Sequence, residues 1–262
     1  MPTVLDRIVA NKREEIAFAK SRRDLKSLIE GAMYGPEVRD FLLAVRGHEY
    51  VRLIAEVKRA SPSKGMIRPQ FDPTDIALAY EAGGAAAISV LTDEPFFQGR
   101  LDYLTSIRQA VSIPVLRKDF ILDEYQVYEA RVAGADAVLL IAECLEGDEL
   151  KQLYDLVHGL GMTALIELYD PSHLDRVLAT GTKLVGVNNR DLHTFAVELD
   201  HVVQLRKEIP SDVTVVAESG IFTAADVEKI HLANIQAMLV GESLMRQTDI
   251  RQATINLLRP SF

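Results

Sequence analysis

Short apolar runs alternate with amphipathic segments from Val51 to the end of the chain. Each run has the length of a buried strand, and the segments between the runs carry helical spacing and helix-end signals. The runs, in order, are VRLIAEV, AAAISVL, PVLRKDF, ADAVLLIA, TALIELY, KLVGVNN, VTVVAES and QAMLVGES. This pattern predicts a regular succession of strands and helices.

The segments between the runs begin and end with residues typical of helix termini. A capping residue, often followed by proline, precedes each of several segments, and glycine commonly follows. The pairs of signals are Asp72-Pro73 with Gly83-Gly84, Asp123 with Gly134, Asp170-Pro171 with Gly181, and Thr223 with Asp226 as a capping box. Eight strand-and-helix units are the number that closes a parallel barrel, so we predict an α/β fold, a (β/α)8 TIM barrel, over residues 49–262. The alternative is an open eight-stranded sheet, but no Gly-x-Gly-x-x-Gly turn follows any strand, which disfavours a dinucleotide-binding sheet.

Residues 1–48 carry two further apolar sets. The first is Val4, Leu5, Ile8 and Val9, and the second is Phe41, Leu42 and Val45. Their spacing predicts a helical extension packed on the barrel. We expect these helices to plug the bottom of the barrel or cover its side; the alternative is that they frame a substrate at the top.

Composition and charge exclude several classes of protein. The 262 residues are 48% apolar, which suits a globular protein with a large core, and their net charge is −9 without any compensating basic tract. We therefore expect no nucleic-acid partner. The longest apolar runs are far shorter than the roughly 20 residues of a membrane helix, and the start of the chain is charged, so we expect neither a membrane span nor a signal peptide. The single cysteine, Cys144, and the absence of close Cys/His pairs predict no disulfide, no zinc site and a cytoplasmic location.

Polar residues follow apolar ones at the inward-facing positions of five predicted strands. In a barrel of this kind the chemistry takes place where the strands end. The successive inward positions are Ile54, Glu56 and Lys58; Leu116 and Lys118; Leu165 and Glu167; Gly186, Asn188 and Arg190; and Val216 and Glu218. Buried unpaired ions would cost several kcal/mol each, so a purely structural origin would require all of them to pair. Their concentration at strand ends instead predicts an active site.

Two glycine-containing loops are candidates for binding phosphate. Ser219-Gly220 follow the seventh strand, and Gly241-Glu242-Ser243 open a short helix after the eighth. Backbone N–H groups of these two loops commonly hold phosphate in this fold, although glycine there is also ordinary turn chemistry. The loop RASPSKG after the first strand offers hydroxyls, cations and a stiffening proline, or is simply a mobile surface loop.

Six ordered motifs at six strand ends resemble those of one enzyme family. They are AEVKRASPSKG (Ala55 to Gly65), LRKDFI (Leu116 to Ile121), ALIEL (Ala164 to Leu168), GVNNRDL (Gly186 to Leu192), AESGI (Ala217 to Ile221) and GESLM (Gly241 to Met245). In these motifs, and in its helical extension, the chain resembles indole-3-glycerol phosphate synthase. The resemblance covers nearly the whole barrel.

The resemblance implies an activity in tryptophan biosynthesis. In that family a (β/α)8 barrel converts 1-(2-carboxyphenylamino)-1-deoxyribulose 5-phosphate to indole-3-glycerol phosphate, with loss of carbon dioxide and water. It implies a phosphorylated small-molecule substrate, a monomer, and neither a metal nor an organic cofactor. The position of Glu242 is a smaller residue in some relatives, so no role is implied for its side chain.

The resemblance also implies roles for the strand-end residues. Lys118 would protonate the carbonyl oxygen, Glu167 would act as base or proton acceptor, and Lys58 would bind the substrate carboxylate or serve as the acid in dehydration. The order in which the two lysines act stays open. Catalytic support would come from Glu56, Glu218 and Asn188; substrate contacts from Ser61, Phe120 and Arg190; and phosphate binding from Ser219, Gly220, Gly241 and the Glu242 backbone.

Two other functions are compatible with such a barrel. Another phosphate-binding enzyme, such as phosphoribosylanthranilate isomerase, would need one acid and one base, with Cys or Asp expected at the end of the first strand, where Glu56 and Lys58 stand here. A non-catalytic barrel that only binds a phosphorylated ligand should have lost part of the lysine and glutamate set. The whole set is present.

Overall fold

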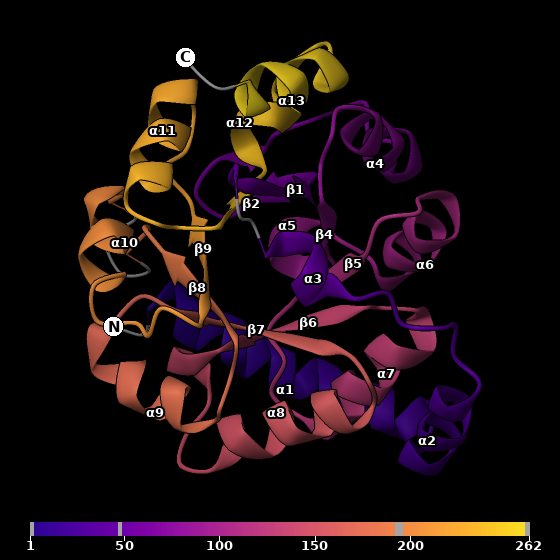
Figure 1. The fold of residues 1–262 in the computed structure, drawn as a ribbon. Helices are drawn as coiled ribbons and strands as arrows, with labels where there is room; N and C mark the ends of the chain where they lie inside the picture. Colours follow the sequence, from indigo (N-terminus) through magenta and orange to yellow (C-terminus); the bar gives the residue numbers. More distant parts are fainter. Residues whose placement is uncertain (1–2, 47–48, 192–195, 260–262) are drawn as a thin grey trace.

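Eight parallel strands close into a barrel in the computed structural model, which describes residues 3–46, 49–191 and 196–259 (Figure 1). The strands are β1 (Arg52–Val57), β4 (Ala87–Leu91), β5 (Val115–Lys118), β6 (Ala137–Ile141), β7 (Thr163–Leu168), β8 (Leu184–Asn188), β9 (Thr214–Glu218) and β10 (Ala237–Val240). Each pairs with its neighbours in this order, and β10 returns to β1. The predicted (β/α)8 barrel is therefore confirmed. Leu192, the last residue of the GVNNRDL motif, lies outside the described residues.

Helices surround the barrel and connect successive strands (Figure 1). They are α4 (Pro73–Ala82), α6 (Leu101–Ala110), α7 (Glu124–Ala133), α8 (Glu149–Gly159), α9 (Leu174–Ala179), α10 (Asp200–Leu205), α11 (Ala224–Leu232) and α13 (Ile250–Leu258), with the short elements α5 (Glu94–Phe97), η1 (Ala142–Cys144), η2 (Pro171–His173) and α12 (Glu242–Met245). The expected start signals act as caps: the Asp72 side chain accepts from the N–H groups of Thr74 and Asp75. Thr223 and Asp226 form the expected capping box. None of the helices in the described ranges is long and apolar enough to span a bilayer.

Alternate strand residues build two separate apolar cores. The first fills the barrel and includes Ile54, Leu116, Leu165 and Val216. The second lies between the strands and the surrounding helices and contains their outward-facing neighbours, such as Leu53. Because side chains alternate along a strand, the polar residues two positions beyond the inner apolar layer also face the barrel axis.

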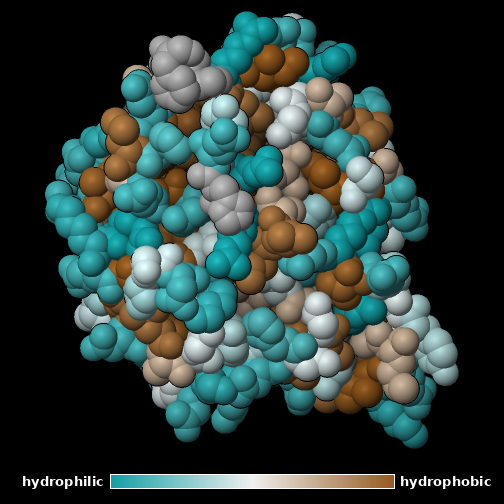
Figure 2. Space-filling view, in the orientation of Figure 1, coloured by the Kyte–Doolittle hydropathy of each residue, from teal (hydrophilic) through white to brown (hydrophobic). Residues whose placement is uncertain are grey.

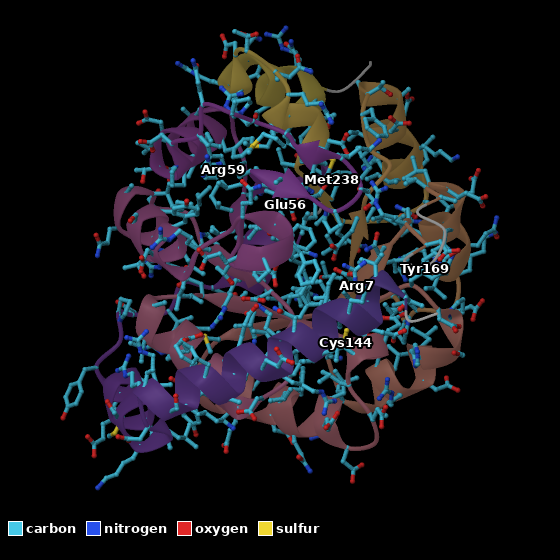
Figure 3. All side chains as sticks on the ribbon, turned by 180° about the vertical axis from the view of Figure 1, so that it is seen from behind. Arg7, Glu56, Arg59, Cys144, Tyr169 and Met238 are labelled. Carbon is cyan, nitrogen blue, oxygen red and sulfur yellow. The ribbon has the colours of Figure 1, made fainter. Side chains whose placement is uncertain are left out.

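Three helices precede the barrel: α1 (Val4–Arg22), α2 (Leu25–Met33) and α3 (Phe41–Val45). Figure 1 looks onto the end where the strands begin, and α3 lies across it; Phe41 and Val45 are completely buried in the inner core. Apolar side chains gather near the middle of this face, where α3 lies (Figure 2). From the opposite side, α1, which carries Arg7, runs across the end where the strands finish (Figure 3). Thus α3 is the plug and α1 frames the other end.

A buried charge cluster holds α1 on the barrel. Lys12 of α1 is only 3% exposed, and its Nζ lies 2.9 Å from Asp93 Oδ2 and 3.0 Å from Asp119 Oδ1. Burial by itself would lower the pKa of Lys12, but the two carboxylates and a hydrogen bond to Glu15 raise it above its ordinary value. Burial would likewise raise the pKa of Asp119, but Arg117 and Lys12 hold it below the ordinary range. Lys12 and Asp119 are therefore both held in their charged forms.

The segment after β1 folds as a small hairpin. Strand β2 (Ala60–Ser61) pairs antiparallel with β3 (Gly65–Met66). Gly65 has φ +62°, residues 62–66 are exposed, and Ser61 lines the cavity. The RASPSKG segment is thus a short hairpin at the edge of the cavity that α1 covers.

We expect Lys12→Met to lower the free energy of unfolding by about 3–5 kcal/mol, because it leaves Asp93 and Asp119 buried without their shared cation. Denaturant unfolding followed by circular dichroism measures the change. Lys26→Met is the matched control: Lys26 is 86% exposed, and its variant should unfold at nearly the native denaturant concentration. Equal midpoints for the two variants would contradict a stabilising role of the cluster.

Candidate active site

A cavity of about 190 Å³ lies at the end of the barrel where the strands finish. Residues from all eight barrel strands or the loops after them line it, and α1 contributes Val4, Leu5 and Ile8. Every residue that the sequence placed in the site lines this cavity: Glu56, Lys58, Ser61, Lys118, Phe120, Glu167, Asn188, Arg190, Glu218, Ser219, Gly220, Gly241 and Glu242. The structure therefore brings all the candidates together at one place.

One ammonium group and two carboxyl groups meet at the centre of the cavity. Lys118 Nζ, at the end of β5, donates to Glu167 Oε2 at 2.9 Å and lies 3.6 Å from Glu218 Oε2. The two glutamates stand near the ends of β7 and β9 and are almost completely buried. Asn188, at the end of β8 between them, donates from Nδ2 to Glu167 Oε1 at 3.1 Å. The Glu167 carboxylate is thus held from two sides.

The protonation states of these three groups differ because of where each one lies. Burial alone would lower the pKa of Lys118, but the surrounding carboxylates raise it above its ordinary value. Burial would raise the pKa of Glu167, but the charge of Lys118 and hydrogen bonds from Lys118, Glu218 and Asn188 hold it below the ordinary range. For Glu218, burial and repulsion by Glu167 raise the pKa well above its ordinary value. The site therefore combines a lysine whose charge is stabilised, a carboxyl group that favours its ionised form, and a second carboxyl group that favours its protonated form.

A second ion pair stands at the end of β1. Lys58 Nζ donates to Glu56 Oε1, and both side chains line the cavity. Gly241, which follows β10, lies against this glutamate: a Cβ atom on Gly241 would be 2.5 Å from Glu56 Oε1 and 3.0 Å from Glu56 Cβ. The absence of a side chain at Gly241 therefore leaves room for the Glu56 side chain.

The loops after β9 and β10 present backbone to the cavity. Ser219 and Gly220 adopt consecutive left-handed conformations, with φ of 64° and 80°. The Glu242 carboxylate pairs with Arg246, the C-cap residue of the short helix α12, at an O···N distance of 3.1 Å. Ser243 Oγ donates to the Ile221 carbonyl at 3.3 Å and joins the two loops. This arrangement can receive an anion on backbone N–H groups without opposing it with the Glu242 side chain.

The motifs at the ends of β1, β5 and β8 carry cations that could attract an anionic substrate, and these cations divide into two groups. Lys58, Lys118 and Arg190 line the cavity. Arg59 instead stacks over the Phe71 ring at 6.0 Å, and Lys64 is exposed in the hairpin turn outside the cavity lining. Over the described ranges, no group of three or more His, Cys, Asp or Glu side chains is arranged to hold a metal ion.

Comparison with known proteins identifies the family. The model of the indole-3-glycerol phosphate synthase family matches residues 5–257. The chain belongs to the indole-3-glycerol phosphate synthase family. It is 57% identical over 256 residues to the indole-3-glycerol phosphate synthase of Rhodopirellula baltica, covering 98% of this chain and 99% of the relative. It is 50% identical over 253 residues to the enzyme of that name from Paracidovorax citrulli, covering 94% and 95%.

Two more distant solved structures share the architecture. A 3-hexulose-6-phosphate synthase aligns with a TM-score of 0.65 at 15% identity, over 79% of this chain and 98% of its own. A thiamine phosphate pyrophosphorylase from Pyrococcus furiosus aligns with a TM-score of 0.61 at 17% identity, over 82% and 95%. At these identities the likeness concerns the barrel fold alone, whereas the match to the indole-3-glycerol phosphate synthase family rests on sequence.

The sequence analysis missed one aromatic residue, Phe97, that lines the cavity in this member of the indole-3-glycerol phosphate synthase family. Phe97 belongs to α5, and its ring centroid lies 6.2 Å from that of Phe120, which the sequence did predict. The sequence signal for Phe97 is weak, because α5 has only a single turn. The alternation of inward and outward side chains applies along a strand, and Phe97 lies beyond the end of β4. The lining residues of α1 were recognised as an apolar face, but nothing in their spacing showed which end of the barrel they cover.

Asn189 was also missed, although it lies within a quoted motif. Its Nδ2 donates to the carbonyls of Glu218 and Ser219, each at 3.0 Å, and its Oδ1 accepts from Val202 N–H at 3.0 Å. Asn189 therefore ties the end of β8 to the loop after β9 and to α10. Its strand parity points it away from the barrel axis, which is why the inward pattern did not include it.

We expect Lys118→Met to raise the titration midpoint of Glu167 by about one pH unit or more, because the ammonium that favours the carboxylate is removed. Carboxyl 13C chemical shifts of labelled glutamate measure it, with the Glu167 resonance assigned by its loss in Glu167→Gln. Lys183→Met removes the same charge from an exposed pair with Asp212 and should leave the midpoint unchanged. An unaltered Glu167 midpoint in Lys118→Met would show that the ion pair does not control this carboxyl.

Proposed function

We propose that the protein catalyses the ring closure of 1-(2-carboxyphenylamino)-1-deoxyribulose 5-phosphate to indole-3-glycerol phosphate, with loss of carbon dioxide and water. The observation that carries this proposal is the Lys118 ammonium held between Glu167 and Glu218 in the cavity of a family member. The reaction needs a cation, a carboxylate and an anion-binding loop around one small molecule. Lys118, Glu167 and the loops after β9 and β10, which line the described cavity, are the candidates for these three parts.

Lys118 is the proposed acid of the first step. The aromatic carbon that bears the carboxylate attacks the keto carbon of the sugar, and the carbonyl oxygen gains negative charge as the carbon–carbon bond forms. A lysine that stays protonated between two carboxyl groups can donate a hydrogen bond and then a proton to that oxygen. Loss of carbon dioxide then returns its bonding electrons to the ring.

Glu167 is the proposed proton acceptor. Its lowered pKa keeps it ionised, and Asn188 holds it in place on the side opposite Lys118. When the former carbonyl oxygen leaves as water, a proton must be lost from the neighbouring carbon, and a fixed carboxylate can receive it. Lys58, which pairs with Glu56, is proposed to bind the substrate carboxylate or to protonate the departing hydroxyl.

The remaining proposals concern substrate binding, oligomeric state, location in the cell and domain organisation. The phosphate is proposed to lie on the backbone of Ser219, Gly220, Gly241 and Glu242, with Ser61 and Arg190 contacting the substrate and Phe120 packing on its ring. With a net charge of −9, the cations of the cavity must set the local field that draws in a doubly anionic substrate. We propose a monomer in the cytoplasm, organised as a helical extension (residues 1–48) and a catalytic barrel (residues 49–262). The start of β1 at Arg52 supports this division.

The chain has no tryptophan, so indole formation can be followed directly by fluorescence against eight Tyr and nine Phe. We expect indole emission when purified protein is mixed with the carboxyphenylamino substrate without added metal, and no detectable emission from Lys118→Ala. Lys183→Ala, at an exposed ion pair, serves as the control and should retain the native rate. Circular dichroism checks that each variant is folded.

One outcome would overturn the proposed function, and another would overturn the role of Lys118. If the native protein binds the compound but produces no emission, the chain is a ligand-binding barrel or acts on a neighbouring substrate. The assay for phosphoribosylanthranilate isomerization then distinguishes these two alternatives. Near-native turnover by Lys118→Ala would instead refute the role of that lysine.

Glu167→Gln should lower kcat by roughly 100-fold or more while KM changes only a few-fold, because the amide keeps the size of the side chain but cannot accept the proton. Single-turnover fluorescence separates the chemical step from binding and product release. Glu208→Gln, a change of the same kind in an exposed turn, is the control. An unchanged single-turnover rate in Glu167→Gln would rule out general-base action by this residue.

A further inference from the structure

Gly186 lies within strand β8, between β7 and β9, where glycine needs a reason. It pairs with Glu167 of β7 and with Val216 of β9. Glycine weakens a strand interior, and it commonly marks a site where another group approaches the backbone closely. Gly186 has no positive φ, so its backbone would accept an ordinary side chain. Backbone conformation therefore does not account for the glycine.

The space beside Gly186 is filled by a carboxyl group. A Cβ atom at this position would lie 2.3 Å from Glu218 Oε1, and 3.4 Å from both Glu218 Cδ and Leu165 Cδ1. The first distance is impossible for real atoms, whereas the other two are close to ordinary contacts. Only the tip of the Glu218 side chain conflicts with a methyl group at residue 186.

The position of the Glu218 carboxyl group affects the ionisation of the groups around it. Glu218 is 2% exposed, its Oε2 lies 3.6 Å from Lys118 Nζ, and its Oε1 has no hydrogen-bond partner in the described part of the chain. Glu218 owes its raised pKa to burial and to Glu167, and in turn it helps to keep Glu167 ionised. A displaced Glu218 carboxyl would change both effects.

We propose that Gly186 is a positioning residue: the absence of a side chain lets the Glu218 carboxyl lie against β8, within reach of Lys118 and Glu167. The position of the carboxyl follows from the contacts alone. Its kinetic consequence rests on the proposed function.

Comparison with two other glycines sharpens the proposal. At Gly241 a Cβ atom would collide with the tip of Glu56 and also press on its Cβ, so substitution there would disturb the stem of the side chain and the turn. At Gly159, the exposed last residue of α8, an added Cβ meets nothing within 4 Å. At Gly186, by contrast, the flexible end of one side chain can give way while the barrel stays intact.

The decisive variant is Gly186→Ala, with Gly159→Ala as the matched control. We expect both to fold and melt like the native protein. In Gly186→Ala the carboxyl must move away from β8 into the cavity, where it is better hydrated, so the upper carboxyl titration midpoint, followed by 13C shifts, should fall by about half a pH unit or more. The kcat for indole formation should fall roughly tenfold or more with KM within about threefold, and the pH profile of kcat should shift with the midpoint.

A second pair of variants tests whether the effect passes through Glu218. In a Glu218→Ala chain there is no carboxyl to displace, so adding Gly186→Ala should change the residual single-turnover rate less than about twofold. An equally large further loss in that background would assign Gly186 to packing alone. An unfolded Gly186→Ala protein, or one with native titration and kinetics, would overturn the proposal as well.

The titration keeps this test separate from the proposed function. If the native protein forms no indole, the proposed function fails, yet the 13C midpoints of Gly186→Ala and Gly159→Ala still show whether residue 186 positions the carboxyl. If the native protein is active and Gly186→Ala has the same carboxyl titration midpoints as Gly159→Ala, only the inference about Gly186 fails.

Discussion

The burial of charge inside the barrel is the constraint on which the rest of this structure depends. Lys118, Glu167 and Glu218 occupy inward positions directly above an apolar layer, where an unpaired ion would be strongly disfavoured. They are tolerated because each lies within reach of an opposite charge or a proton shared with its neighbour. Strand ends, glycines and the helix above the cavity are arranged so that these few atoms can stay close together while largely shielded from water.

The two ends of the barrel meet different demands. At the end where the strands begin, α3 places fully buried apolar side chains against the inner core, and the contacts there serve stability. At the other end the lid is α1, whose apolar residues border the cavity and whose Lys12 is held by carboxylates from the loops after β4 and β5. A single extension thus supplies a plug through one helix and a wall of the candidate site through another.

Much of this could be predicted from the sequence, because parity along strands is a local property. The alternation in LRKDF and AESGI placed Lys118 and Glu218 on the inside, and the caps at Asp72 and Thr223 marked helix starts correctly. Positions set by tertiary packing could not be predicted in this way. The side of the barrel covered by α1 depends on a charge cluster between distant segments, and the contribution of Asn189 depends on backbone groups of two other elements.

The Lys12 cluster also has a consequence for the order in which the molecule assembles. Lys12 precedes the barrel in the chain, but its partners are Asp93, after β4, and Asp119, after β5. Until both have been synthesised and their strands paired, α1 has no charged partner on the barrel and its apolar face has no cavity to border. Helix α1, which precedes the barrel strands, must therefore dock late, and a growing chain carries it undocked through the synthesis of the first three barrel strands.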